Sequence, residues 1–308
     1  MNCQVCRGDD WETLYTAHDY LSDEHFAIRR CRACGMASTS PQPADLSRYY
    51  TTEYYGNKML RFPAWMEALV RRFRGARALE VERMVKRPGR VLDIGCGRGW
   101  TLAALQQKGW HCQGAELSPA SAAFGRDELG LQVTEEPLRE DSFPPESFDV
   151  VMLWHSLEHL AEPREQLEWA ARWLRPGGLL KVAVPNFGST QAGFGKELWF
   201  HLDPPRHLHH FSQDSLAALL GATGFQPLLW TRFSLEYDLF SWVQTLLNRV
   251  GLPAGLLYRL LHVRARLGWR EKLMAIPCLV AAALLSPLAL ALTALADGST
   301  IEVWAIRT

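Results

Sequence analysis

The chain has 308 residues, with 33 basic and 33 acidic side chains and 48% hydrophobic residues. This length allows one large domain or two modest ones, and the hydrophobic content excludes a disordered chain. The balanced charge argues against a nucleic-acid binder, which usually carries a basic excess, so we expect no nucleic acid among the partners. The opening residues MNCQVCRGDD hold neither a basic nor an apolar segment, which predicts no secretory signal and a cytoplasmic location.

Four of the seven cysteines form two Cys-x-x-Cys pairs near the N-terminus. Cys3 and Cys6 are separated by 24 residues from Cys31 and Cys34, and the run HFAIRRC between the pairs predicts a strand. Two thiolates on each of two facing turns suit a tetrahedral zinc ion, and four cysteines leave no open coordination position. The pattern predicts a structural zinc ribbon with its linker over residues 1–55. Redox dithiols or free thiols are the alternative interpretation.

The next segment alternates between helical and β-type runs. A helix is expected over residues 64–86 and is ended by Pro88 and Gly89. Pro176, Gly177 and Gly178 are expected to form a turn into the strand LLKVAVPN. The preceding strands are VLDI, HCQGAEL, LQVTEE and FDVVMLWHS, separated by the helical runs TLAALQQKG, PASAAFGRDELG and PREQLEWAARWL. This alternation predicts an α/β fold with a doubly wound, mostly parallel sheet over residues 56–235, whose ligands bind beyond the carboxyl ends of the strands.

The first of these strands runs into a glycine loop, RVLDIGCGRGW, with Gly95, Gly97 and Gly99 at alternate positions. Glycine there permits positive φ and close approach of the backbone to a ligand. Glu116 closes the second strand, where an acid accepts hydrogen bonds from ribose hydroxyls. Nicotinamide dehydrogenases share that feature. The DxGxGxG pattern, with Asp93 inside the strand, favours enzymes that use S-adenosylmethionine.

The glycine loop and the later segments together resemble the class I S-adenosylmethionine-dependent methyltransferases. The likeness extends to a bacterial branch that has an N-terminal CxxC…CxxC module and often a cell-envelope or sugar-related context. The resemblance implies a seven-stranded, Rossmann-like sheet and S-adenosylmethionine as the cofactor. The segments that carry it are VLDIGCGRG, AELSPAS, SFDVVMLWHSLEHLAEP, WLRPGGLLKVAVPN and HLHHFSQDSLAALLGATGF.

The same resemblance implies roles for individual residues. The three glycines would bend around the methionine part of the cofactor, and Asp93 would support that loop and the ammonium group. Glu116 would bind the ribose, Leu117 would lie against the adenine, and the adenine edge would be met within residues 135–138. Trp154 and His155 would face the sulfur or methionine end.

Methyl transfer needs an aligned nucleophile and, for many acceptors, a base. His155, Glu158 and His159 are candidate bases, although Glu158 and His159 could instead brace neighbouring loops. In the loop HLDPPRHLHHFS, His207 is the first choice for a catalytic or substrate role, and a metal held by the loop histidines is a further option. Ser212 is expected to cap the helix that follows. The other histidines of the loop are His201, His209 and His210, and of these His209 and His210 are expected to pack or to lie at the helix entry.

The alternation stops after the run FQPLLWTRF, and residues 236–298 form an apolar helical insertion before a last strand at residues 299–308. Residues 273–296 carry no charge over 24 positions, a length that could cross a membrane. The run TIEVWAIRT alternates like a final sheet strand, so the chain must return to the side it left, and Pro277 and Pro287 are expected to interrupt the apolar run.

The insertion also has a basic excess. Residues 249–272 hold six Lys or Arg and one acid, Glu271. Apolar helices flanked by cations predict peripheral contact with the inner face of the cell membrane. A helical lid, a dimer interface and a transmembrane helix are the alternatives.

The sequence therefore predicts an enzyme that transfers a methyl group from S-adenosylmethionine to a small-molecule or lipid-linked acceptor. An envelope sugar or glycan and a quinone-like lipid are the two acceptor classes considered. The rival hypothesis is a zinc-ribbon binding or regulatory protein that uses the methyltransferase fold as a cofactor sensor. A nicotinamide dehydrogenase is a third.

Overall fold

The computed structural model describes residues 2–50, 62–262 and 267–308. The chain forms two compact units, each built from segments that are distant in the sequence. Unit 1 holds residues 1–64, 185–216 and 231–301, and unit 2 holds residues 65–184, 217–230 and 302–308. The four-part division predicted from the sequence follows the chain linearly and stays a prediction.

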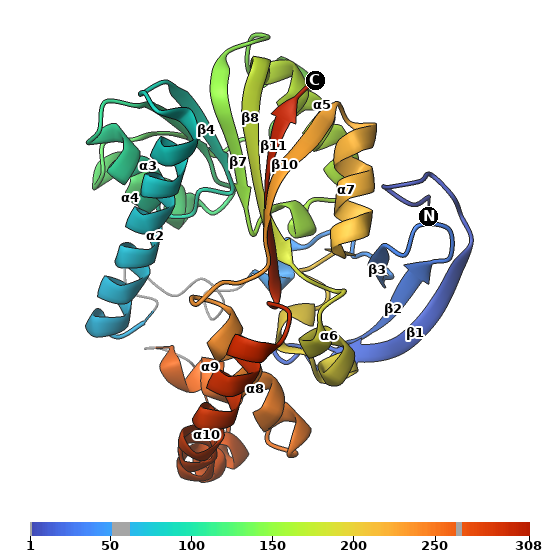
Figure 1. Cartoon of the computed structure of the whole chain (residues 1–308). Helices are drawn as coiled ribbons and strands as arrows, with labels where there is room; N and C mark the ends of the chain where they lie inside the picture. The colour runs from blue at the N-terminus through green and yellow to red at the C-terminus, as the bar shows by residue number, and fades with distance from the viewer. Residues whose placement is uncertain (1, 51–61, 263–266) are drawn as a thin grey trace. The chain divides into compact units, whose positions relative to one another are not determined.

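Unit 2 contains a seven-stranded sheet in the order β10-β11-β8-β7-β4-β5-β6 (Figure 1). The pairs β4/β5, β4/β7, β5/β6 and β7/β8 are parallel, which confirms the predicted mostly parallel, doubly wound sheet. The run TIEVWAIRT joins this sheet as a strand, as its alternation predicted, and lies between β10 and β8. The strands are β4 (Arg90–Ile94), β5 (His111–Ala115), β6 (Gln132–Thr134), β7 (Phe148–Trp154), β8 (Leu174–Pro185), β10 (Phe225–Thr231) and β11 (Thr300–Arg307).

Helices cover both faces of this sheet. The helices α2 (Ala64–Val85), α3 (Trp100–Gln106) and α4 (Pro119–Asp127) lie on one face, and α5 (Pro163–Trp173) lies on the other (Figure 1). On the first face, Val81, Leu102 and Ala122 from the three helices pack with Val91 and Val150 of the sheet in one buried cluster. Successive side chains of a strand alternate between faces, so both faces of β4 and β7 are buried and the strands read as continuous apolar runs.

The start of β8 corrects one sequence expectation. The segment with Pro176, Gly177 and Gly178 was expected to be a turn before the strand, but it lies within β8 (Leu174–Pro185). Phe148 of β7 pairs with Leu174, and the next aligned pair is Val150 with Leu179, so the register shifts there. Gly177 has a φ of +71°, a value that suits glycine, and the segment bulges out of the ladder.

Unit 1 holds a second sheet in the order β1-β2-β3-β9, in which the pairs β1/β2, β2/β3 and β3/β9 are antiparallel. The run HFAIRRC forms β2, as predicted. The two-residue β9 comes from far along the chain, and its His209 and His210 pair with Ser38 and Ala37 of β3. The strands are β1 (Trp11–His18), β2 (His25–Cys31), β3 (Ala37–Ser40) and β9 (His209–His210).

The other helices belong wholly or partly to unit 1. The predicted cap is confirmed, because the Ser215 backbone N–H donates to the Ser212 Oγ at 3.2 Å. The helices are α6 (Thr190–Gly195), α7 (Gln213–Ala222), α8 (Asp238–Arg249), α9 (Leu256–Leu261) and α10 (Trp269–Leu295), with single 3-10 turns at Ser47–Tyr49, Lys196–Leu198 and Phe200–Leu202.

The apolar insertion forms a cluster in which α10 packs along α8 and α9. The expectation that prolines interrupt it was wrong, since α10 is one helix with Pro277 and Pro287 inside it. Cys278 follows Pro277, and Ala282 and Ala289 lie on either side of Pro287; all three are buried in the cluster and hold the helix together despite the missing backbone donors. By length and composition alone, α10 could cross a membrane, yet little of its apolar surface is buried in the protein.

Candidate functional site

The glycine loop lies at the carboxyl end of β4, where the sheet passes into α3. Gly95, Gly97 and Gly99 have φ values of +78°, +56° and +80°, which is the left-handed region that favours glycine. A Cβ on Gly95 would lie 2.6 Å from the Ser156 Cβ, so this position has no room for a side chain. A Cβ on Gly97 would meet nothing within 4 Å. The middle of the loop therefore presents bare backbone to open space, as a ligand cradle requires.

Asp93 lies inside β4 beneath this loop and is the most informative residue of the site. Its side chain is buried, and among the described residues its Oδ1 has no hydrogen-bond partner. Burial raises the pKa of Asp93 to about 7, with the Arg74 charge opposing that shift and Glu116 adding to it. A buried carboxylate oxygen without a donor is costly unless a ligand supplies one. A cationic amine, such as the ammonium group of S-adenosylmethionine, fits that requirement.

Glu116 follows β5 and connects two loops. Its Oε2 accepts from the Gly97 N–H at 2.9 Å, and its Oε1 accepts from the Ser118 N–H at 2.7 Å. Burial raises the pKa of Glu116, and these two backbone donors oppose the rise. Each carboxylate oxygen keeps a further lone pair for a ribose hydroxyl. The Leu117 side chain next to it is 63% exposed, which suits an apolar contact with a planar base.

Trp154, at the end of β7, lies in a charged network that the sequence did not predict. The Arg77 guanidinium is 4.1 Å from the centre of its ring, and the Lys181 Nζ is 4.9 Å from it. The fully buried Lys181 bonds to Glu80 at 2.6 Å and to Glu302 at 2.9 Å. Cations therefore already contact the ring, while the buried indole N–H has no acceptor among the described residues. That N–H is the part of Trp154 available to a ligand.

The loop after β7 joins the glycine loop through Ser156, whose hydroxyl donates to the Ile94 carbonyl at 2.7 Å. His155 has a φ of +51°, which is uncommon for a residue other than glycine. Its Nδ1 lies 3.2 Å from an oxygen of Glu158, whose side chain is buried. A buried carboxylate against one ring nitrogen orients the imidazole, as bases of acid–base catalysis are commonly oriented. His159 is half-buried in the same 3-10 turn, Leu157–His159.

The histidines of the loop before α7 belong to unit 1 and are largely internal. His207 is buried, and its Nδ1 lies 2.8 Å from the His201 carbonyl. His209 contacts Ser38 at 3.1 Å, and His210 contacts Thr39 at 3.0 Å, across the β3/β9 pair. Burial holds the pKa of His210 well below its ordinary value, with His207 and His209 adding to this shift. These contacts assign His209 and His210 to packing, while the role of His207 stays a prediction.

The four N-terminal cysteines converge. All four Sγ atoms lie within 4.8 Å of one another, with Cys3 and Cys34 at 3.4 Å and Cys6 and Cys31 at 3.5 Å. Zinc–sulfur bonds of about 2.3 Å place tetrahedral sulfurs about 3.8 Å apart, so the cluster has the right size.

The two cysteine turns are built alike. The N–H of Arg7 donates to the Cys3 carbonyl at 2.9 Å, and the N–H of Gly35 donates to the Cys31 carbonyl at 2.9 Å. Arg7 and Gly35 both have positive φ. Two equivalent knuckles that present four thiols to one point are suited to a single metal ion.

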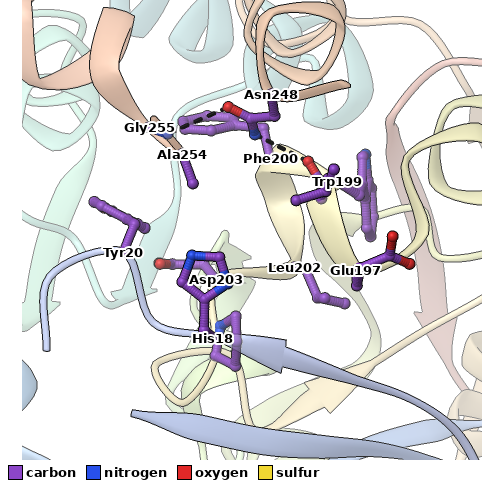
Figure 2. A pocket seen from close by; sticks show the side chains of 12 residues that line it. His18, Tyr20, Glu197, Trp199, Phe200, Leu202, Asp203, Asn248, Ala254 and Gly255 are labelled. Carbon is purple, nitrogen blue, oxygen red and sulfur yellow. Dashed lines mark hydrogen bonds between the residues drawn. The ribbon is translucent and has the colours of Figure 1, made fainter. Parts of the chain in front are cut away.

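A separate pocket lies within unit 1, between the end of β1 and the C-terminus of α8 (Figure 2). The Asn248 Oδ1 accepts from the Gly255 N–H at 3.3 Å, and its Nδ2 donates to the Leu198 carbonyl at 2.9 Å, which fixes one wall. The buried Arg206 bonds to both Asp19 and Asp203 beside it. The charges of Arg206, Asp19 and Asp203 are thus paired with one another and help to hold unit 1 together.

Comparison with known proteins identifies the family. A family model described as "Methyltransferase domain" matches residues 65–229, more than half of the chain. The chain belongs to the methyltransferase-domain family. The predicted resemblance to the class I S-adenosylmethionine-dependent methyltransferases is thereby confirmed, and so is the predicted enzyme class. The matched segment holds the glycine loop, Glu116 and His155.

Two curated relatives of this methyltransferase are each named ubiquinone biosynthesis O-methyltransferase. The protein of Maricaulis maris is 36% identical over 134 residues, which are 40% of this chain and 51% of the relative. The protein of Stutzerimonas stutzeri is 31% identical over 144 residues, or 43% of this chain and 61% of the relative. This methyltransferase therefore spans only about half to three fifths of these relatives.

The fold likeness extends to a solved S-adenosylmethionine-dependent methyltransferase from Archaeoglobus fulgidus. The two structures agree with a TM-score of 0.51 at 19% identity, and the match covers 85% of this chain and all of the other. At that identity the likeness concerns the fold alone.

Sequence reasoning missed the residues that surround Trp154. Arg77 appears in the sequence as one of several arginines of a surface helix, yet its side chain is buried. Lys181 did carry a signal, because it is the single charge in the apolar run LLKVAVPN. A charge in a strand buried on both faces needs partners, but only the tertiary structure shows that these are Glu80 and Glu302.

Proposed function

We propose that this methyltransferase binds S-adenosylmethionine at the β4–β5–β7 edge of unit 2 and methylates a hydroxyl group of a quinone-like small molecule. The observation that carries the cofactor assignment is the buried Asp93 Oδ1, which has no donor among the described residues and lies beneath a bare glycine loop. The acceptor class is supported by the names of the two curated relatives. A lipid-linked envelope sugar is the competing acceptor.

Different residues of the chain would bind the cofactor and accept the proton of the acceptor. S-adenosylmethionine would supply an electrophilic methyl group on a sulfonium. Asp93 would hold the ammonium group and Glu116 the ribose, which fixes the donor in one orientation. Leu117 would contact the adenine. His155, oriented by Glu158, would accept the proton of the attacking hydroxyl.

The proposal includes two further elements. The cysteine cluster holds a structural zinc ion, which Cys3, Cys6, Cys31 and Cys34 would bind as thiolates. The enzyme works in the cytoplasm with peripheral contact to the membrane through residues 236–298. The cluster geometry supports the first element, and the exposed apolar surface of α10 supports the second.

Titration calorimetry tests the cofactor site. The wild type is expected to bind S-adenosylmethionine, and Glu116→Ala is expected to weaken this binding roughly 10- to 100-fold, since two hydrogen bonds to a charged group are lost. NAD should bind to neither protein. A wild type that binds no S-adenosylmethionine would sink the proposal and favour the zinc-ribbon regulatory hypothesis, and tight NAD binding would favour a dehydrogenase.

The acceptor is tested with S-adenosylmethionine labelled in the methyl group. We expect label to enter a polyprenylated catechol or hydroquinone and to be absent from polyprenyl-linked sugars. The reverse pattern would retain the cofactor site and replace the acceptor class.

The base is tested at His155. His155→Asn is expected to lower kcat by about 10²- to 10⁴-fold, a typical loss for a general base, with S-adenosylmethionine affinity nearly unchanged. Asparagine tolerates positive φ, so the backbone conformation is retained. His159→Asn is the matched variant for comparison, because it makes the same substitution at the other histidine of this loop, in the 3-10 turn that follows Ser156. Equal kcat in the wild type and His155→Asn would remove His155 from the mechanism.

A further inference from the structure

The helix α10 has two apolar faces, and among the residues that the structure describes only one of them is packed inside the protein. One face, which includes Cys278, Ala282 and Ala289, packs on α8 and α9. The opposite face carries apolar side chains at helical spacing, and we call these residues the α10 stripe. Its members and their exposed fractions are Trp269 (72%), Leu273 (66%), Ile276 (74%), Val280 (54%), Leu284 (74%) and Leu295 (86%).

The stripe is too long to be a scatter of single surface residues. At 1.5 Å per residue, the 27-residue helix is about 40 Å long. Soluble proteins rarely expose a continuous apolar surface of that extent unless something binds it.

The charges at the N-terminal end of α10 indicate what binds it. Arg270 and Lys272 are exposed beside Trp269. The neighbouring acid, Glu271, is ion-paired with Arg259 and accepts from the Gly268 N–H at 2.7 Å, so it does not offset them. The next acid along the chain is Asp297, beyond the helix. An aromatic ring and two cations at one end of an apolar helix match the headgroup region of an anionic bilayer.

The prolines of α10, together with its packing on α8, favour a helix in the membrane plane over one that crosses the bilayer. Pro277 and Pro287 have no N–H, so the carbonyls of Leu273 and Ala283 lose their helical donors. Water and headgroups can satisfy such carbonyls at the interface, whereas in the hydrocarbon core the protein itself must supply the donors. The other face of α10 also stays packed on α8, whose inward side chains include the buried Gln244 and Asn248.

We propose that the α10 stripe docks this methyltransferase on an anionic membrane leaflet, with the helix lying in the headgroup plane and its α8–α9 face turned toward the protein. The use of this contact rests on the proposed function, because a quinone-like acceptor dissolves in that leaflet. The contact itself depends only on the stripe and its cations.

Flotation of the full chain with vesicles tests the contact. The wild type is expected to float with phosphatidylcholine vesicles that contain phosphatidylglycerol, and to float poorly with phosphatidylcholine alone or at high salt. The triple variant Leu273→Gln, Ile276→Gln, Leu284→Gln should lose about tenfold or more of the bound fraction. The double variant Leu228→Gln, Leu229→Gln is the matched control, since these leucines of β10 are each 51% exposed outside α10. It should float like the wild type.

Three results would overturn the docking surface. These are a wild type that stays with the unbound fraction, a triple variant that floats normally, and a lipid-free wild-type dimer that the triple variant converts to monomers. Retention of the wild type in the membrane after alkaline carbonate extraction would show a crossing helix and overturn the in-plane geometry. S-adenosylmethionine binding, measured on every variant, reports on unit 2 separately. If the wild type bound no S-adenosylmethionine, this would count against the proposed function, and the flotation result would still hold.

Discussion

Asp93→Asn is expected to make the cofactor-free protein more stable at pH 8 and to weaken S-adenosylmethionine binding roughly 10- to 100-fold, the loss of one hydrogen bond to a charged group. The two effects have one cause. The buried carboxylate is costly without a cation and is retained for the ligand that supplies one. Stability given up at a functional site in this way is common in enzymes.

The sign of the stability effect follows from the raised pKa of Asp93. Its value of about 7 in the folded protein, against an ordinary 3.8, means that the folded state holds the proton more tightly than the unfolded state. Protonated Asp93 therefore stabilises the folded protein in full below about pH 3.8, and this stabilisation is lost as the pH rises through about 7. About three pH units at 1.36 kcal/mol each set an upper limit of about 4 kcal/mol above pH 7. The charge of the nearby Arg74 stabilises the ionised carboxylate, so Asp93→Asn gains less stability than this upper limit.

The measurement is denaturant unfolding of wild type and Asp93→Asn at pH 5 and pH 8, with calorimetric binding at the same pH values. Wild-type affinity for S-adenosylmethionine should fall as the pH drops below about 7, because protonated Asp93 attracts the ammonium group less. The variant should show no such trend.

Asp149→Asn provides the contrast. The pKa of Asp149 is lowered, because the Arg90 N–H and the Arg175 side chain outweigh the effect of its burial. Its loss should destabilise unit 2 at pH 8 and leave cofactor binding intact. If Asp93→Asn destabilised the protein as Asp149→Asn does, Asp93 would be a structural residue.

Cys31→Ser is expected to remove zinc from the protein and unfold the four-stranded sheet of unit 1. Cys31 is buried at the end of β2, and its carbonyl and N–H hold the second knuckle through Gly35 and Met36. Structural zinc sites contribute folding free energy directly, about 10 to 16 kcal/mol in small zinc modules. Loss of one of four thiolates should therefore disorder the module.

Metal analysis of the purified protein should give one zinc per chain for the wild type and none for Cys31→Ser. Amide hydrogen exchange over β1 to β3 should rise sharply in the variant. Cys112→Ser, at a half-buried thiol of β5 in unit 2, should keep both zinc and protection. A zinc-free wild type whose four thiols oxidise and reduce reversibly would establish the redox dithiols instead.

Local pattern carried the prediction of the sheet and of the cofactor edge. The alternation of runs around VLDI and LLKVAVPN determines parallel strands, because each run must bury both faces. The spacing of Gly95, Gly97 and Gly99 determines a loop that only positive φ can form. The knuckle at Cys34 was predictable for the same reason, since Gly35 permits the turn that the thiols need.

The features that depend on distant partners were not predictable from local pattern. Lys181 lies 101 positions from Glu80 and 121 from Glu302, so its neutralisation appears only when α2 and β11 pack on β8. The same holds for β9, whose pairing with β3 supplies the partners of His209 and His210, two residues that the sequence only suggested were packed. The prolines of α10 were misjudged because burial on α8 keeps the helix whole.

The sequence by itself thus determined the doubly wound sheet, the cysteine knuckles and the glycine loop, because each depends on contacts or dihedral angles within a short stretch. The tertiary structure alone decided that Asp93 is buried without a donor, that cations cover Trp154, and which face of α10 is exposed. Those properties depend on which groups the rest of the chain brings near, and for the described residues the fold leaves Asp93 to a ligand and the α10 stripe to a surface outside the protein.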